Sequence, residues 1–265
     1  MQGSADAVAS QTADLLKIID LVAARPPDWP HVLRGIWHQA TLVTFVNPLS
    51  VSTARHRADF LDELASFDFV YADSILIAKL ASLLRGEPVE RRSFDGNSMA
   101  PELFGLCHER SLRVALVGGR PGVAAAAGRV FHRSFGTRPM LAAAGYFEDR
   151  AQRRNLLRTI ARRGPEVVIC GMGSGIQDRF LLDLAGEGWK GLGITCGGYF
   201  DQVVASGVRY YPGFVDRLHL RALYRMMREP LRLLPRYTQD YMPFYRAALG
   251  MLAGRGFSSS LERPW

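Results

Sequence analysis

The chain has 265 residues, 48% hydrophobic and 22% charged, so it is long enough for one sizeable buried core and too apolar for a disordered polymer. Its three cysteines are an odd number without close spacing, which excludes a disulfide framework or a structural zinc site as the basis of the fold. The net charge of +8 favours an anionic partner, and no apolar run approaches the ~20 residues that span a bilayer.

Residues 1–10 carry no basic cluster and precede no signal-peptide core, so secretion is not expected and this end is expected to be loose. The cysteine usage fits a reducing compartment. We therefore expect a cytoplasmic protein that reaches the inner membrane only as a peripheral protein on its cytosolic face.

From residue 41 onward, apolar runs bounded by Gly, Pro or Asp alternate with segments of helical period. This alternation is typical of an α/β, Rossmann-like parallel sheet with helices on both faces. Strands are expected at Thr41–Val46, Phe67–Tyr71, Leu112–Val117, Met140–Ala143, Val167–Cys170 and Gly191–Thr195. Helices are expected at Ser50–Ala65, Ser74–Leu84, Asn97–Glu109, Val123–Phe135, Asp149–Arg163 and Gln177–Ala185.

The residues least typical of a core follow the predicted strands, at the carboxyl ends where such sheets bind ligands. Thr44 and Asn47 close the first strand, and Asp73 follows the second. Glycine-rich or aromatic turns follow the remaining strands, at residues 118–122, 145–147, 171–177 and 196–201.

Composition changes after Ser206. Residues 205–265 contain ten Arg, no Lys and four acidic residues, a net charge of +6. We therefore expect a Rossmann-like catalytic domain at 1–207 and a basic, Arg-rich helical appendage at 208–265. Pro230 is expected to kink the appendage helix or to start a second one.

Arginines recur at helical spacing in this appendage, at positions 217, 221, 225, 228 and 232. A charged helical face is usually solvated and mixes Lys with Glu, whereas Arg alone suits bidentate binding of phosphate. Interleaved tyrosines fit a lipid headgroup boundary, so we expect contact with the anionic inner membrane. No nucleic-acid module surrounds these arginines, so nucleic acid is not expected as a partner.

The glycine-rich turns have both functional and structural interpretations. Gly118 and Gly119 can offer backbone N–H groups to a phosphate, but a tight turn without a ligand fits equally well. Their spacing matches neither the dinucleotide fingerprint nor the P-loop, so a nicotinamide cofactor is not supported. Gly171 and Gly173 precede Gln177, whose amide can contact a uracil edge or a sugar hydroxyl, or can simply face solvent.

Asp73 is the candidate general base, because a carboxylate at the tip of an apolar strand is partly desolvated. Capping the helix that follows is the commoner role for such a residue. Asp95, which precedes Gly96 in a typical turn pair, and Asp201, which can cap or orient the glycine loop before it, are weaker candidates of the same kind. The six histidines show no metal-ligand spacing, so neither a metal site nor a cofactor is expected.

In chain order, these residues resemble the WecG/TagA/CpsF family of bacterial glycosyltransferases, which build lipid-linked intermediates for wall teichoic acid, enterobacterial common antigen and exopolysaccharides. The resemblance runs from about Thr41 to Tyr237, and seven motifs in the right order are more specific than any one of them. The motifs are Thr44-x-x-Asn47-Pro48, Ala72-Asp73, Val117-Gly118-Gly119-x-Pro121-Gly122-Val123-Ala124, Gly145-Tyr146-Phe147, Gly171-Met172-Gly173 with Gln177-Asp178, Gly197-Gly198-x-Phe200-Asp201, and Leu223-Tyr224-Arg225 leading to Glu229-Pro230 and Arg236-Tyr237.

The resemblance implies an inverting transfer from a UDP-sugar to a polyprenyl-diphosphate-linked sugar, without a metal-binding DxD motif. It implies Asp73 as the base, Thr44 and Gln177 at the donor site, and an appendage that completes the active site near the membrane. A homo-oligomer is compatible with this scheme. Substrate contacts are expected from Thr44, Asn47, Arg92, Asp95, Gly118, Gly119, Tyr146, Phe147, Gly171, Gly173, Gln177, Gly198, Asp201, Arg221, Arg225 and Arg228.

Three segments differ from the family pattern. Ala72-Asp73-Ser74 stands where Pro-Asp-Gly is usual, Ile176-Gln177-Asp178 replaces Lys-Gln-Glu, and residues 91–98 replace Arg-x-x-Gly-Ser-Asp. These segments surround the donor and acceptor sites, so N-acetylmannosamine, glucose and a uronic acid all stay open as the transferred sugar. The alternative functions are a Rossmann-type oxidoreductase or methyltransferase, and a non-catalytic membrane scaffold that binds a sugar nucleotide.

Overall fold

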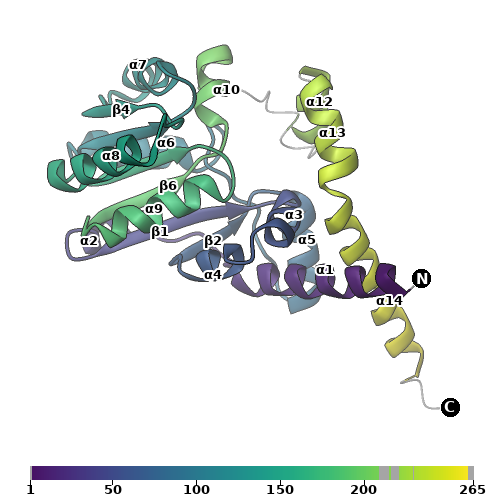
Figure 1. The fold of residues 1–265 in the computed structure, drawn as a ribbon. Coiled ribbons are helices and arrows are strands. Elements are labelled where there is room, and N and C mark those ends of the chain that lie inside the picture. The colour runs from purple at the N-terminus through teal and green to yellow at the C-terminus, as the bar shows by residue number, and fades with distance from the viewer. Residues whose placement is uncertain (1, 209–214, 216–220, 229, 262–265) are drawn as a thin grey trace.

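The computed structural model describes residues 2–208, 215, 221–228 and 230–261. In these ranges, helices surround one six-stranded sheet (Figure 1). The strands are β1 (Ala40–Val46), β2 (Phe69–Ala72), β3 (Val114–Gly118), β4 (Leu141–Ala143), β5 (Val167–Gly171) and β6 (Gly191–Thr195). The helices are α1 (Gln2–Leu21), α2 (Trp29–Gly35), α3 (Leu49–His56), α4 (Phe60–Ala65), α5 (Ile75–Arg85), α6 (Met99–Glu109), α7 (Val123–Phe135), α8 (Arg150–Arg163), α9 (Ile176–Gly186), α10 (Tyr199–Ser206), α12 (Arg221–Arg228), α13 (Pro230–Pro235), the π-helical η1 (Arg236–Asp240) and α14 (Met242–Leu261).

The sheet has the strand order β2-β1-β6-β5-β3-β4, and every neighbouring pair is parallel. All six strands lie where the apolar runs predict them, so the Rossmann-like α/β class is confirmed. Parallel strands need crossover connections, and helices supply them.

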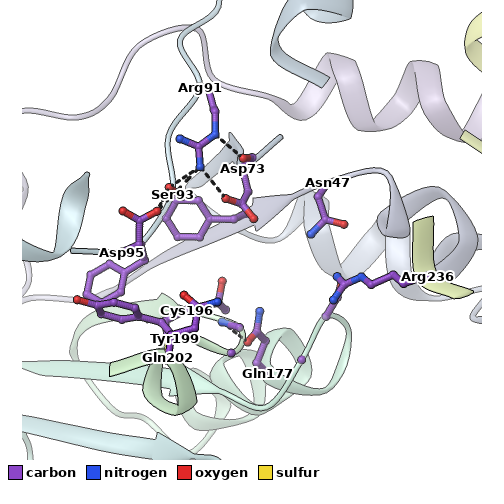
Figure 2. Close-up of a pocket in the computed structure, with 17 residues that line it drawn as sticks. Asn47, Asp73, Arg91, Ser93, Asp95, Gln177, Cys196, Tyr199, Gln202 and Arg236 are labelled. Carbon is purple, nitrogen blue, oxygen red and sulfur yellow. Dashed lines mark hydrogen bonds and ion pairs between the residues drawn. The ribbon is translucent and has the colours of Figure 1, made fainter. Parts of the chain in front are cut away.

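Because all strands run in one direction, the carboxyl ends of β1, β2, β5 and β6 lie along one rim of the sheet. The segments that leave these strands carry Asn47, Asp73, Gln177 and Tyr199, which are among the side chains labelled in Figure 2. The fold thus gathers residues that are up to 191 positions apart, from Phe45 to Arg236, at one place.

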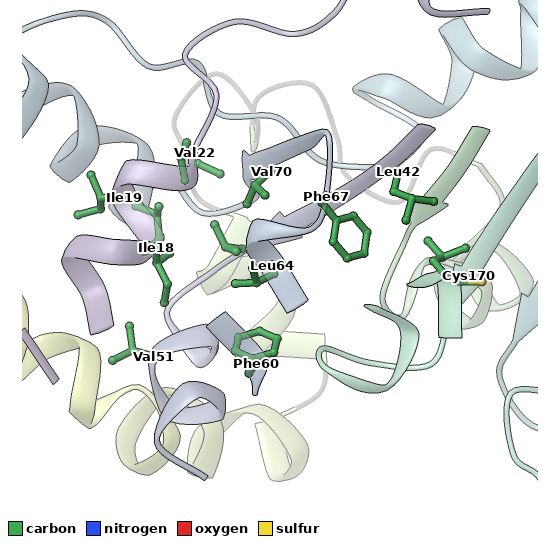
Figure 3. Close-up of a cluster of buried hydrophobic side chains, with 14 of the residues drawn as sticks. Ile18, Ile19, Val22, Leu42, Val51, Phe60, Leu64, Phe67, Val70 and Cys170 are labelled. Carbon is green, nitrogen blue, oxygen red and sulfur yellow. The ribbon is translucent and has the colours of Figure 1, made fainter. Parts of the chain in front are cut away.

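Successive strand residues pack into different apolar layers, as the pleat requires. In β3, Val114 and Leu116 belong to the layer formed with α2, α6, α7 and α10, whereas Ala115 and Val117 belong to the layer formed with α1, α3, α4, α5, α8, α9 and α14. Figure 3 shows part of the second layer. Full burial of each large aliphatic or aromatic side chain contributes ~1.5–3 kcal/mol, so both layers stabilise the sheet.

The sequence predicts a loose N-terminal end, and this prediction is wrong. The N-terminal segment forms α1 and packs against α14 (Figure 1). Leu15, Ile18, Ile19 and Val22 are spaced as one helical face, and each is at most 1% exposed. The partner of this face includes Phe244 and other residues more than 220 positions away, which is why local pattern alone did not reveal it.

Two other differences from the predicted helices concern local backbone geometry. The single helix expected at Ser50–Ala65 is divided into α3 and α4, because Arg57 is extended (φ −135°, ψ 104°). Pro230 is the first residue of α13, which is one of the two roles predicted for it. None of the described helices combines the length and apolar character that crossing a membrane needs.

Candidate active site

A pocket opens over the carboxyl ends of β1, β2, β5 and β6 (Figure 2). Its empty volume, counted out to the open mouth, is about 790 Å³. It is lined by Phe45, Asn47, Asp73, Arg91, Ser93, Phe94, Asp95, Gly173, Ser174, Gln177, Thr195, Cys196, Gly197, Gly198, Tyr199, Gln202 and Arg236.

Asp73 stands at this pocket immediately after β2. Its backbone N–H donates to the carbonyl of Val46 (2.9 Å), which fixes the residue beside the end of β1, and its side chain is 39% exposed. Asp73 is not the helix cap that local sequence favours, because the hydroxyl of Ser74 caps α5 by accepting from the N–H of Leu76 (3.2 Å). The carboxylate of Asp73 is therefore not used by the helix and can act in the pocket.

Arg91 is the cation nearest to this carboxylate among the ion pairs described. Its Nε donates to the backbone carbonyl of Asp73 (2.7 Å), and its Nη2 lies 3.4 Å from Asp73 Oδ1. The same Nη2 donates to the hydroxyl of Ser93 at 2.9 Å. Arg91 thus holds the Asp73 backbone firmly and its carboxylate only loosely.

Asp95 and Arg221, both expected to bind substrate, bind each other. The Asp95 carboxylate is paired with the guanidinium of Arg221 from α12 and accepts from Ser93 Oγ (2.5 Å) and the N–H of Asn97 (2.9 Å). Asp95 lines the pocket but is only 7% exposed. Its visible function in the free protein is to join the pocket wall to the C-terminal helices.

Two amides face the pocket from different strands. Gln177, 4% exposed, accepts from the N–H of Gly197 (3.1 Å) through its Oε1, and Asn47 Oδ1 accepts from the N–H of Leu49 (2.9 Å). Both oxygens are occupied by the backbone, and both amide nitrogens face the pocket (Figure 2). They are placed to donate hydrogen bonds to sugar hydroxyl or phosphate oxygens.

Thr44 lies beneath the pocket and not in its wall. It is 0% exposed, and its hydroxyl donates to Asp178 Oδ1 (2.5 Å), so Thr195 must donate to it across their 3.0 Å contact. The other oxygen of Asp178 accepts from the N–H of Gly175 (2.6 Å). Burial raises the pKa of the Asp178 carboxyl, and its hydrogen bonds from Thr44 and Gly175 oppose that shift. In the free protein, Thr44 therefore supports the glycine turn before α9.

Close packing accounts for the glycine pair after β3. A Cβ on Gly118 would lie 2.3 Å from the carbonyl oxygen of Gly171, and the N–H of Gly119 donates to that same oxygen (3.0 Å). A Cβ on Gly171 would in turn lie 2.7 Å from the carbonyl of Gly197. None of these three glycines lines the pocket, whereas Gly173 and Gly198 do.

Four other predicted contacts lie outside the pocket wall. Phe147 stacks on Phe180 (centroids 6.0 Å apart), and Tyr146 is 69% exposed. Arg92 pairs with Glu90 (2.9 Å), and Asp201 is exposed in the first turn of α10. Arg225 and Arg228 belong to α12, but their side chains lie outside the described residues.

The structure adds residues that the sequence did not single out. Arg236 of η1 lines the pocket, and its Nε is buried without a hydrogen-bond partner among the described atoms. Arg91, Ser93 and Tyr199 also line it. In the sequence, the only signal for these residues is that they lie within the segments compared with the family pattern. Burial raises the pKa of the neighbouring Cys196 thiol well above its usual range, so this thiol is not prepared as a nucleophile.

Guanidinium groups therefore dominate the chemistry of the rim. Arg91 and Arg236 line the pocket together with the carboxylates of Asp73 and Asp95, and Arg221 neutralises the latter. Such a site can bind an anion while one carboxylate remains to accept a proton. In the described part of the chain, no three His, Cys, Asp or Glu residues are grouped so that they could hold a metal ion.

Comparison with known proteins agrees with this chemistry. The sequence model of the glycosyl transferase WecG/TagA/CpsF family matches residues 27–256. The chain is 26% identical over 211 residues to the UDP-Gal:alpha-D-GlcNAc-diphosphoundecaprenol beta-1,4-galactosyltransferase of Shigella boydii, covering 79% of this chain and 86% of that one. It is 28% identical over 192 residues to the N-acetylglucosaminyldiphosphoundecaprenol N-acetyl-beta-D-mannosaminyltransferase of Bacillus subtilis (strain 168), covering 72% and 73%.

The buried position of Thr44 predicts that it acts on stability without any ligand. Thr44→Val removes the donor to a buried carboxylate, so the free energy of unfolding should fall by about 1–3 kcal/mol in denaturant titrations of the free protein. Thr159→Val is the control, because the exposed Thr159 hydroxyl donates only to the carbonyl of Asn155 within α8, and its effect should stay within about 0.5 kcal/mol. Unchanged stability with weakened UDP binding would instead support direct donor contact by Thr44.

Proposed function

We propose a sugar transfer to a lipid-linked acceptor, because this chain belongs to the glycosyl transferase WecG/TagA/CpsF family. In this proposal a hexose-type sugar moves from a UDP-sugar to a polyprenyl-diphosphate-linked sugar, in the synthesis of an exopolysaccharide or another cell-surface polysaccharide. The observation that carries it is the Asp73 carboxylate, which faces a pocket whose other charged walls include Arg91 and Arg236.

The relatives' names support the classes of both substrates. The Shigella boydii protein uses UDP-Gal, and both names contain an undecaprenol-diphosphate-linked N-acetylglucosamine. One name specifies a galactosyl transfer and the other an N-acetylmannosaminyl transfer. The donor sugar of this chain is therefore left open in the proposal, while the nucleotide and the lipid diphosphate are specified.

In the proposed mechanism, Asp73 removes the proton of the acceptor hydroxyl as its oxygen bonds to the anomeric carbon. The bond from that carbon to the UDP oxygen breaks at the same time, and its electron pair leaves with UDP. Attack from the side opposite the leaving group inverts the anomeric centre. A positioned general base contributes about 10²–10⁴-fold to such a step.

The departing UDP gains negative charge, which the site must stabilise. Guanidinium groups suit this task because they form bidentate, charge-assisted hydrogen bonds with phosphate oxygens. Arg236 supports this role because its buried Nε has no partner among the described atoms. We therefore propose a metal-independent transfer in which arginines and backbone N–H groups stabilise the leaving group.

We also propose that residues 208–265 form an appendage that rests on the anionic inner membrane. Large apolar side chains of its helices are exposed, among them Leu231 (93%), Met227 (77%) and Leu249 (67%). Such side chains beside arginines fit the boundary between lipid headgroups and acyl chains. A peripheral position there would bring the pocket to a lipid-linked acceptor. Assembly into a homo-oligomer stays a prediction.

The function itself is tested by a panel of UDP-sugars assayed with a polyprenyl-diphosphate-linked N-acetylglucosamine. One UDP-sugar should yield acceptor-dependent UDP release and a product of inverted anomeric configuration by NMR, with no loss of rate in EDTA. UDP should also raise the melting temperature, since a ligand that binds only the folded state stabilises it. Stabilisation by NAD or S-adenosylmethionine alone would point to the oxidoreductase or methyltransferase class, and UDP binding without turnover to a scaffold.

The role of Asp73 is tested by Asp73→Asn, which keeps the shape of the side chain and removes the base. Transfer should fall by about 10²–10⁴-fold, while the dissociation constant for UDP, measured by calorimetry, should change little. Asp28→Asn is the matched control, because exposed Asp28 makes no side-chain cap with α2. Full turnover by Asp73→Asn would remove it as the base.

Membrane contact is tested by sedimentation with vesicles that contain anionic phospholipid. Leu231→Ser with Leu249→Ser should reduce the bound fraction several-fold, since both remove exposed apolar area. Leu83→Ser is the control: Leu83 is 53% exposed but lies near the end of α5, outside the appendage. Equal binding by all three proteins would contradict the proposed contact.

A further inference from the structure

The Asp95 carboxylate connects the pocket wall to the C-terminal helices. It accepts from Ser93 Oγ (2.5 Å) and the N–H of Asn97 (2.9 Å), and it is paired with Arg221 of α12. The nearest nitrogen of Arg91 lies 3.9 Å away. A buried carboxylate requires such compensation, and its loss would remove a negative charge from beside both Arg91 and Arg221.

The same loop also contacts the residue at which the C-terminal segment begins. A Cβ built on Gly96 would lie 1.8 Å from the carbonyl oxygen of Val208, so only glycine fits this approach. The loop at residues 93–97 therefore meets the C-terminal segment twice, through the backbone at Val208 and through the side chain of Arg221.

The contact between Arg91 and the Asp73 carboxylate is long for an ion pair. Its distance is 3.4 Å, whereas charge-assisted N–H···O bonds are typically ~2.7–2.9 Å. Arg91 Nη2 is instead held at 2.9 Å by Ser93, whose own proton goes to Asp95. Asp95 thus fixes the hydroxyl that draws Arg91 away from Asp73 (Figure 2).

We propose that Asp95 is a positioning residue: through Ser93 it keeps Arg91 from closing on the Asp73 carboxylate, and through Arg221 it makes this arrangement depend on the docked C-terminal helix. The proposal rests on the proposed role of Asp73 as the base. A carboxylate in a full bidentate pair with arginine is both covered and a weaker base. Asp95 therefore maintains the reactivity of a residue that it does not touch.

Removing the negative charge of Asp95 and removing the positive charge of Arg221 should then have opposite effects on the pH dependence of activity. The charged groups around Asp73 are Arg91 and Asp95 from the segment after α5, Arg221 from α12 and Arg236 from η1. Without the Asp95 charge, Arg91 is free to pair fully with Asp73, and Arg221 loses its ion pair with Asp95. Without the Arg221 charge, Asp95 attracts Arg91 more strongly and leaves Asp73 in a more negative environment.

The experiment measures the pH dependence of kcat/KM for the full chain and its variants. Asp95→Asn should lower kcat about tenfold and move the midpoint of the acidic limb to lower pH by about 0.5–1 unit. Arg221→Gln should move that midpoint to higher pH by a similar amount, and the double variant should return it close to wild type. If Asp95→Asn fails to fold, the upward shift in Arg221→Gln still tests the proposal.

The matched control is an ion pair at the other end of the sheet, in which a buried glutamate meets a half-exposed arginine. Arg113 and Glu166 precede β3 and β5 and pair with each other, so Glu166→Gln should lower the melting temperature without moving the acidic limb. An unmoved limb in Arg221→Gln, or equal shifts in the same direction in both variants, would overturn the positioning role. Activity retained in Asp73→Asn would instead overturn the proposed mechanism, so the two failures are distinguishable.

Discussion

Every strand of the sheet runs in the same direction, and this constraint decides where chemistry can occur. Each connection must return across a covered face as a helix, so the chain leaves the buried layers repeatedly at one rim. Asn47, Asp73, Gln177 and Gly198 all belong to such departures, after β1, β2, β5 and β6. Strand pairing thus brings these four residues together at the pocket, and the C-terminal segment adds Arg236 from outside the sheet.

The rim also contains polar groups that do not face a ligand. Asp178 is 1% exposed, and both of its oxygens accept hydrogen bonds, from Thr44 and from the backbone of Gly175. A buried carboxylate lowers stability unless such donors compensate it. Its place at the start of α9 explains the arrangement, because it fixes the turn whose Gly173 forms part of the pocket wall. Thr44 and Asp178 therefore support the turn from below, whereas Gly173 and Gln177 line the pocket.

The sequence predicted what depends on local pattern. Continuous apolar runs located all six strands, and residues that follow strands located Asp73, Asn47 and Gln177. It placed Thr44 at the donor site, and in the free protein that side chain is buried beneath the pocket, on the face of β1 that carries Leu42 and Val46. It could not predict the Asp95–Arg221 pair or the contact between α1 and α14, because both join segments more than 120 residues apart.

The contact between α1 and α14 also has a consequence during biosynthesis. These helices belong to one apolar layer, but about 220 residues separate the end of α1 at Leu21 from the start of α14 at Met242. At about 5–20 residues per second, a ribosome needs roughly 10–45 s to translate that interval. Throughout it, the face of α1 that α14 will cover has no native partner. The nascent chain should therefore be exposed to chaperones, and to aggregation, at this face of α1 until α14 is made.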